Sequence, residues 1–183
     1  MGTLINNYVF KALDSFDYDL AQTMEALNYA ISYDDKNTMA LTLMGRVYAE
    51  KLYKYDEAIG YYKEVLGINI NAFEVYVHYI NVLLWNEHYE EAARFIDFAL
   101  TVKGSDKGML YFKKAILNDQ LKQYGKALKN IKKATNNTYN SDFMYTLNAA
   151  KERIKDKMPK KKKASKKKKN KKNKKKKKAS TKN

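Results

Sequence analysis

The sequence contains no cysteine, and it has only 1 proline and 7 glycines among 183 residues. Without cysteine there can be no disulfide framework, no thiolate nucleophile and no cysteine-bound metal. The scarcity of glycine and proline removes the turn residues on which β-sandwiches and barrels depend. The composition therefore favours a helical protein, and we expect it in the reducing environment of the cytoplasm.

Long apolar runs and catalytic motifs are also missing. No window approaches the roughly 18 uninterrupted apolar residues that a membrane-spanning helix needs, and Asp14 and Asp17 interrupt the N-terminal stretch before it could serve as a signal peptide. The sequence has no glycine-rich phosphate loop, nucleophile motif or paired carboxylates at catalytic spacing. The only histidines, His78 and His88, lack metal-ligand spacing. We therefore predict a protein that is not an enzyme and needs no metal or cofactor.

Positive charge is abundant but is concentrated at one end of the chain. The formal net charge is +16, yet residues 157–183 hold 17 lysines and no acidic residue. Residues 1–156 are almost neutral, with 19 basic and 20 acidic side chains. Within them, residues 1–106 hold 8 basic and 16 acidic side chains, whereas residues 107–156 hold 11 basic and 4 acidic ones. The part of the chain that can fold is therefore electrically polarised.

Residues 158–183 are predicted to form a disordered polylysine tail, because no large apolar side chain follows Met158 to offset the entropy of ordering. Flexible lysines suit loose, salt-sensitive binding to many phosphates, and without aromatic side chains nucleic-acid bases have nothing to stack on. We expect nonspecific binding to RNA or another polyanion. Alternatives are an anionic membrane surface, acidic proteins, a nuclear import signal or a purely solubilising role. The predicted polyanion-binding residues are Lys160, Lys161, Lys162, Lys163, Lys166, Lys167, Lys168, Lys169, Lys171, Lys172, Lys174, Lys175, Lys176, Lys177 and Lys178.

The rest of the chain repeats itself at intervals of 34 or 35 residues. Four segments, LAQTMEALNYAI, YDEAIGYYKEVL, YEEAARFIDFAL and YGKALKNIKKAT, align without gaps. Each has a small, a large apolar and a small residue at positions i, i+4 and i+7, which lie on one face of a helix. These residues are Thr23, Leu27 and Ala30; Ala58, Tyr62 and Val65; Ala92, Ile96 and Ala99; and Ala127, Ile131 and Ala134. The pattern predicts the same helix–helix contact four times.

Another helical segment precedes each of these four. The predicted ranges are 4–15, 38–52, 72–86 and 107–122. Asn71, with Glu74 three residues later, is typical of a helix start, Gly67 of the stop before it, and Gly104 of the next break. The chain is therefore predicted to form a series of antiparallel helix pairs.

A two-helix repeat of this length resembles the tetratricopeptide repeat family. The match is best in LTLMGRVY, which places Leu41, Met44, Gly45 and Tyr48 at the family's signature positions of the first helix. The other repeats carry Lys11, Ile80 and Ala115 at the glycine position, and all four repeats lack the closing proline. The resemblance implies a right-handed superhelical solenoid of four helix-turn-helix repeats, at about 4–37, 38–72, 73–107 and 108–139.

A last helix is expected to close the solenoid. Asn140 is a suitable cap, and Phe143, Leu147, Ala150 and Ile154 would lie on one helical face. We interpret residues 140–157 as a capping helix that covers the apolar side of the fourth repeat. The predicted folded domain is therefore 1–157, followed by the tail.

The resemblance also implies a partner-binding groove lined by the first helix of each repeat. Carried over to this sequence, its residues include Tyr8, Phe16, Arg46, Asn81, Trp85, Phe112 and Gln120. Aromatic side chains at helical spacing also pack internally, so packing is the alternative for each of them. We expect an adaptor that holds a protein or peptide partner in the groove and is tethered to a polyanion by its tail. The alternative is an RNA-binding or ribosome-associated helical repeat protein, whose folded body itself contacts RNA.

Overall fold

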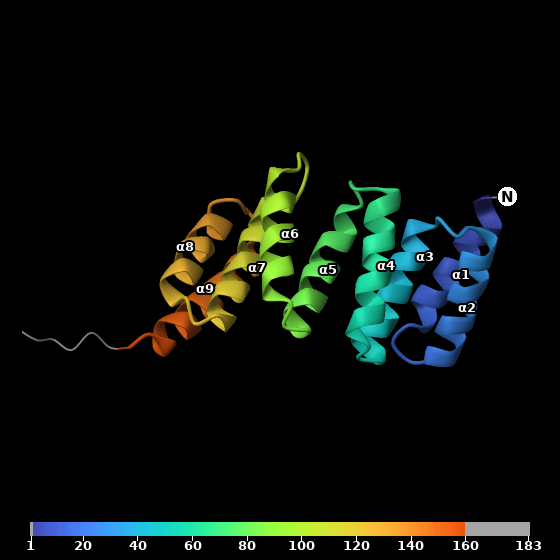
Figure 1. The fold of residues 1–183 in the computed structure, drawn as a ribbon, viewed down its shortest axis with the longest axis horizontal. Coiled ribbons are helices and arrows are strands. Elements are labelled where there is room, and N and C mark those ends of the chain that lie inside the picture. Colours follow the sequence, from blue (N-terminus) through green and yellow to red (C-terminus); the bar gives the residue numbers. More distant parts are fainter. Residues whose placement is uncertain (1, 160–183) are drawn as a thin grey trace, which may run out of the picture.

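The computed structural model describes residues 2–159, which form an array of α-helices without a strand in that range. The helices are α1 Gly2–Ser15, α2 Leu20–Tyr33, α3 Thr38–Arg46, α4 Tyr55–Ile68, α5 Phe73–Trp85, α6 Tyr89–Thr101, α7 Lys107–Gln120, α8 Tyr124–Thr135 and α9 Ser141–Lys157. The tail residues 160–183 lie outside the described range. Figure 1 shows the helices standing side by side in chain order, from the pair α1–α2 to the pair α7–α8 with α9. The prediction of an all-α repeat solenoid is confirmed.

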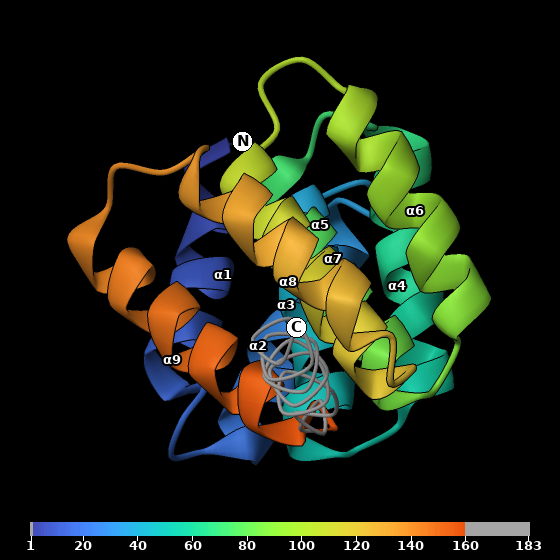
Figure 2. The same ribbon diagram turned by 90° about the vertical axis from the view of Figure 1, so that its left-hand side faces the viewer.

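Successive pairs turn about the long axis of the array. Figure 2, seen from the end that carries α8 and α9, shows α3, α5 and α7 toward the middle of the molecule and α4 and α6 at its edge. In the two central pairs the first helices, α3 and α5, therefore lie nearer the middle than the second helices, α4 and α6, as in other stacked helix-pair arrays.

The small–large–small pattern predicted from the sequence is buried in all four repeats. Each of its twelve side chains is at most 2% exposed. Thr23 is the only polar member, and its hydroxyl lies 2.8 Å from the Ser15 hydroxyl and donates to the Asp19 carbonyl at 2.8 Å. A hydroxyl can therefore replace alanine at this contact, because both of its hydrogen-bonding roles are satisfied inside the repeat.

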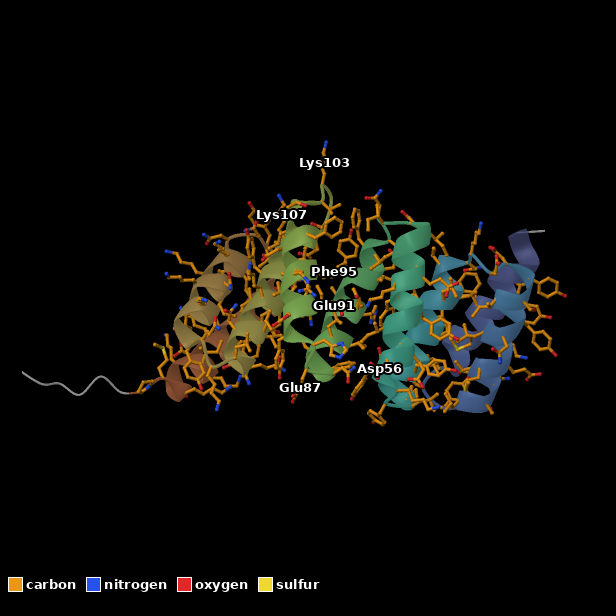
Figure 3. The ribbon with its side chains drawn as sticks, viewed as in Figure 1. Asp56, Glu87, Glu91, Phe95, Lys103 and Lys107 are labelled. Atoms are coloured by element: carbon orange, nitrogen blue, oxygen red, sulfur yellow. The ribbon has the colours of Figure 1, made fainter. Side chains whose placement is uncertain are left out.

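Aromatic side chains join the second and third repeats. The Tyr79 ring of α5 lies 6.3 Å from the Tyr62 ring of α4 and 4.8 Å from the Phe95 ring of α6. Glu91 of α6 accepts a hydrogen bond of 2.6 Å from the Tyr79 hydroxyl and pairs with Lys63 of α4 at 2.8 Å. Figure 3 shows Glu91 and Phe95 on the side of α6 that faces α5 and α4. Burial of large apolar groups contributes about 1.5–3 kcal/mol per side chain, so this junction stabilises the contact between the two repeats.

A π-helical segment, Val47–Lys51, follows α3 and was not predicted. The second repeat has one more residue than the others between the glycine position and the start of its second helix, Tyr55. The wider turn absorbs this residue: the Leu52 N–H bonds to the Val47 carbonyl, five residues back. The predicted range 38–52 is therefore helical nearly throughout, but it is not one regular α-helix.

The turns inside three of the repeats share one backbone geometry. Tyr53, Glu87 and Lys122 each stand two residues before the second helix and have φ values of 55°, 57° and 58°. The following amide closes each turn: His88 bonds to the Leu83 carbonyl and Gln123 to that of Asn118, at five residues' separation, and Lys54 to that of Tyr48, at six. The extra residue of the second repeat thus changes the span of the bond but preserves the turn.

Two of the predicted helix ends are wrong. Asn71 does not cap α5, because the N-cap position is Ala72 and no side chain bonds to the first turn. Gly67 lies within α4, which continues to Ile68. The break at Gly104 is confirmed, with φ +93°, as is the cap by Asn140, whose side chain accepts from the Phe143 N–H.

Gly45 provides a test of the packing inside the second repeat. A Cβ atom at this position would lie 2.6 Å from Cε1 of Tyr62, whose side chain is fully buried. We expect Gly45→Ala to lower the free energy of unfolding by about 1–3 kcal/mol, because neither the ring nor the backbone has room to move. Chemical denaturation followed by circular dichroism measures this difference.

Gly60→Ala is the matched control. Gly60 lies within α4 and has no heavy atom within 4 Å of the site of an added Cβ. We expect this change to raise the free energy of unfolding by about 0.5–1 kcal/mol, because alanine favours the helix. Equal effects of the two substitutions would contradict the assigned contact of Gly45 with Tyr62.

Candidate functional site

The candidate site is the surface formed by the first helices of the repeats, which we call the A-helix face. It comprises the residues predicted for the groove and three further side chains between them. The predicted residues are Tyr8, Phe16, Arg46, Asn81, Trp85, Phe112 and Gln120, and the further ones are Glu50, His78 and Lys113. These residues come from α1 and the turn after it, α3, the π-helical segment, α5 and α7. In each of these helices the opposite face is held in the core by its contact with the second helix.

Two predicted residues of the A-helix face, Phe16 and Arg46, lie against each other. The Arg46 guanidinium is 4.4 Å from the centre of the Phe16 ring, and the Lys51 ammonium is 4.6 Å from it. Phe16 is only 6% exposed. Such cation–π contacts stabilise an aromatic ring that is covered by charged side chains. Phe16 therefore packs between repeats and is not open to a partner.

Arg46 is also engaged by Glu50, one turn later. Its Nε and Nη2 atoms donate to the two carboxylate oxygens of Glu50 at 3.0 and 3.2 Å, which is a bidentate pair. Glu50 in turn lies 3.8 Å from Nδ1 of His78 on α5. The N-terminal half of the A-helix face is thus closed by its own polar contacts across three repeats.

His78 lies in a partly desolvated position, and its ring stacks on that of Tyr62 at 6.4 Å. Burial lowers the pKa of His78 below its ordinary value, and the neighbouring Arg46 lowers it further, while Glu50 acts in the opposite direction. Burial also lowers the pKa of the Lys113 ammonium on α7. At both positions burial makes the protonated, charged form of the side chain less favourable than it is in water.

The C-terminal half of the A-helix face is more open. Trp85 is 48% exposed at the end of α5, and its ring lies 6.1 Å from the ring of Tyr55 at the start of α4. Asn81 is half-buried on the same helix, and Gln120 is exposed at the end of α7. These three side chains, with the half-buried Lys113, present an indole, two amides and an ammonium group at the surface.

Tyr8 and Phe112 make contacts within the protein at opposite ends of the array. The Tyr8 ring stacks on Tyr29 and Tyr33 of α2, at 5.4 and 6.1 Å. The Phe112 ring meets Phe143 of α9 edge-on at 5.6 Å. Both rings thus have packing contacts within the protein, and both remain partly exposed.

A shallow hollow lies elsewhere, along one face of α2. Its volume is about 580 Å³, and it is lined by Ala21, Met24, Glu25, Asn28, Tyr29 and Ser32. All six residues belong to one helix, so no second element closes the hollow around a small molecule. It does not coincide with any residue predicted for the groove.

Residues 2–159 contain neither a group of side chains arranged to hold a metal ion nor a helix both long and apolar enough to cross a membrane. Phe16 and Arg46 were predicted for the groove from the sequence, but their contact with each other was not. His78 was interpreted as an isolated histidine, without a role in the site. The signal for the network was the position of Glu50 one turn after Arg46, but the link to His78 requires the stacking of the repeats.

The pH dependence of stability tests the position of His78. Because its pKa is lowered in the folded state, the unfolded chain binds more protons as the pH falls below the ordinary histidine value of about 6.5. We expect the wild-type protein to lose stability between about pH 7 and pH 5, by at most about 1.4 kcal/mol per pH unit from this residue. Denaturation curves should show a smaller loss for His78→Gln; an unchanged pH dependence would contradict the assignment.

Comparisons with known proteins identify the fold. No protein-family model matches the sequence, and no curated protein matches it. Solved structures do: MamA from Desulfovibrio magneticus RS-1 has a TM-score of 0.63 at 18% identity, over 84% of this chain and 89% of that one. PilF of Pseudomonas aeruginosa has a TM-score of 0.67 at 16% identity, over 83% and 73% of the two chains.

A thermophilic TPR protein of Thermus thermophilus is also similar, with a TM-score of 0.66 at 12% identity over 80% of both chains. At these identities the likeness concerns the arrangement of the helices and not the side chains of the A-helix face. It agrees with the resemblance of the second repeat to the tetratricopeptide signature. The described part of this chain therefore has the tetratricopeptide-repeat fold.

Proposed function

We propose that the protein is a non-catalytic adaptor, which binds a segment of a protein partner on the C-terminal half of the A-helix face. The observation that carries this proposal is the half-exposed Trp85 beside polar side chains on a rigid helical layer. Exposed aromatic anchors surrounded by polar groups are typical of protein interfaces. We place the protein in the cytoplasm on the basis of its lack of cysteine.

The chemistry of this surface restricts the partner. Trp85 would cover an apolar side chain of the bound segment, while Asn81 and Gln120 would bond to its main chain or to polar side chains. The half-buried Lys113 would favour a carboxylate, because a nearby anion offsets the cost of desolvating the ammonium group. The N-terminal half of the face contributes little, since Arg46 and Glu50 already satisfy each other.

The second part of the proposal concerns the lysine tail, which lies outside the described residues. Its 16 lysines and lack of acidic residues support a salt-sensitive tether to RNA or another polyanion. The body, with 19 basic and 20 acidic side chains, lacks the overall positive charge that nonspecific RNA binding needs. Two weak contacts, one through the body and one through the tail, would reinforce each other in one assembly.

A peptide-binding measurement tests the A-helix face. Peptides selected on the full-length protein from a random library should lose about tenfold or more in affinity on Asn81→Ala combined with Trp85→Ala, because this removes the anchor and its neighbouring amide. Phe98→Ala, which truncates a 42% exposed aromatic residue on α6, is the control and should bind normally. Equal binding by both variants, with unchanged helical circular dichroism, would contradict the site.

Removal of the tail tests the polyanion tether. A chain ending at Pro159 should unfold at nearly the same temperature as the full-length protein, because the folded domain is predicted to end at residue 157. It should also lose its salt-sensitive retention on immobilised RNA. Retention equal to that of the full-length protein would reject the tether and support the alternative, in which the folded body binds RNA.

A further inference from the structure

The first helix exposes the residues that bind the preceding repeat elsewhere in the array. Phe10 occupies the position of Met44, Tyr79 and Lys114 in the later repeats. Tyr79 meets Tyr62 of the preceding α4, and Lys114 pairs with Asp97 of the preceding α6. This position therefore faces the second helix of the repeat before it.

Leu13, one turn after Phe10, shows the same contrast. Its equivalents Val47, Val82 and Leu117 are at most 3% exposed, whereas Leu13 is 41% exposed and Phe10 is 55% exposed. Two large apolar side chains at contact positions are thus uncovered within the described chain. At internal junctions the same positions are buried in the core, so this surface has the shape of one side of a repeat junction.

The charges around this surface restrict what can cover it. Residues 2–33 carry Lys11 against four acidic residues, Asp14, Asp17, Asp19 and Glu25, of which Asp17 is paired with Lys51 of the second repeat. Contact between the α1 surfaces of two copies would therefore bring acidic side chains close to each other. The opposite end of the array is basic: α8 and α9 together hold eight basic side chains, four of them the lysines of α8, against three acidic ones, Asp142, Glu152 and Asp156.

The basic end also offers apolar contacts. Leu147 and Ile154 hold α9 on the fourth repeat, which leaves Met144 at 37% and Tyr145 at 78% exposure. Figure 2 shows α8 and α9 facing outward together at this end. An apolar surface with acidic surroundings at one end is therefore matched by an apolar surface with basic surroundings at the other.

We propose that copies of this chain associate end to end, with the α1 surface at Phe10 and Leu13 of one copy packed on the α8–α9 end of the next. The contact is heterologous, because it joins two different surfaces, and it leaves a free end of each kind on every assembly. Association then continues beyond the dimer. Opposite charges raise the association rate and set the direction of pairing, and the contact weakens as salt screens them.

Sedimentation velocity of the full-length protein over a range of concentrations provides the test. The wild type should form species that grow with concentration, and added salt should reduce them. Phe10→Ser combined with Leu13→Ser, and Met144→Ser combined with Tyr145→Ser, should each raise the dissociation constant about tenfold or more. The control Phe98→Ser removes an exposed aromatic residue from the third repeat and should associate as the wild type does.

Mixing the two double variants gives the sharpest result. Each retains one intact surface, so the mixture should form a 1:1 dimer that does not grow further. Self-association of the Met144/Tyr145 variant at wild-type strength would indicate a two-fold contact between α1 surfaces and would overturn the proposal. A wild type that remains monomeric up to about 1 mM would overturn it as well, because even a contact with a dissociation constant of about 1 mM would be about half occupied at that concentration.

Discussion

The structure depends on one contact: a helix that places a small residue, a large apolar residue and a second small residue on the same face. The small residues allow two helices to approach closely, and the large one fills the space between them. This contact is made by α2, α4, α6 and α8, and all twelve of its side chains are buried. A single pair cannot cover its own apolar surface, so the chain becomes stable only as pairs accumulate.

Sequence reasoning located the helices because burial in this fold follows a local period. Residues three and four positions apart share a face, so the pattern around Ala58 and Tyr62 is visible without knowledge of any distant contact. The capping helix was predicted for the same reason, from the cap residue Asn140 and the spacing of Leu147 and Ile154. The helix end at Gly67 and the helix start at Asn71 were predicted wrongly. Whether a single glycine ends a helix, or a single asparagine caps one, depends on the contacts around it in the folded structure.

The candidate site was less accessible to prediction because its contacts join different repeats. Arg46 covers the Phe16 ring, and Glu50 lies close to His78. Both contacts depend on how neighbouring helix pairs are rotated relative to each other. The sequence could indicate which residues share the A-helix face but not which of them already have partners. The exposure of Trp85 and the packing of Phe112 against Phe143 follow from the same cause.

The widened turn at Val47–Lys51 shows how such a chain tolerates a change of length. An added residue in a regular helix would rotate every later side chain by about 100°, since one turn takes about 3.6 residues. Here the backbone takes up the addition within a few residues, and Gly45 and Ala58 on either side both keep their buried places. Insertions can therefore enter the array one repeat at a time, without disturbing the register of the repeats that follow.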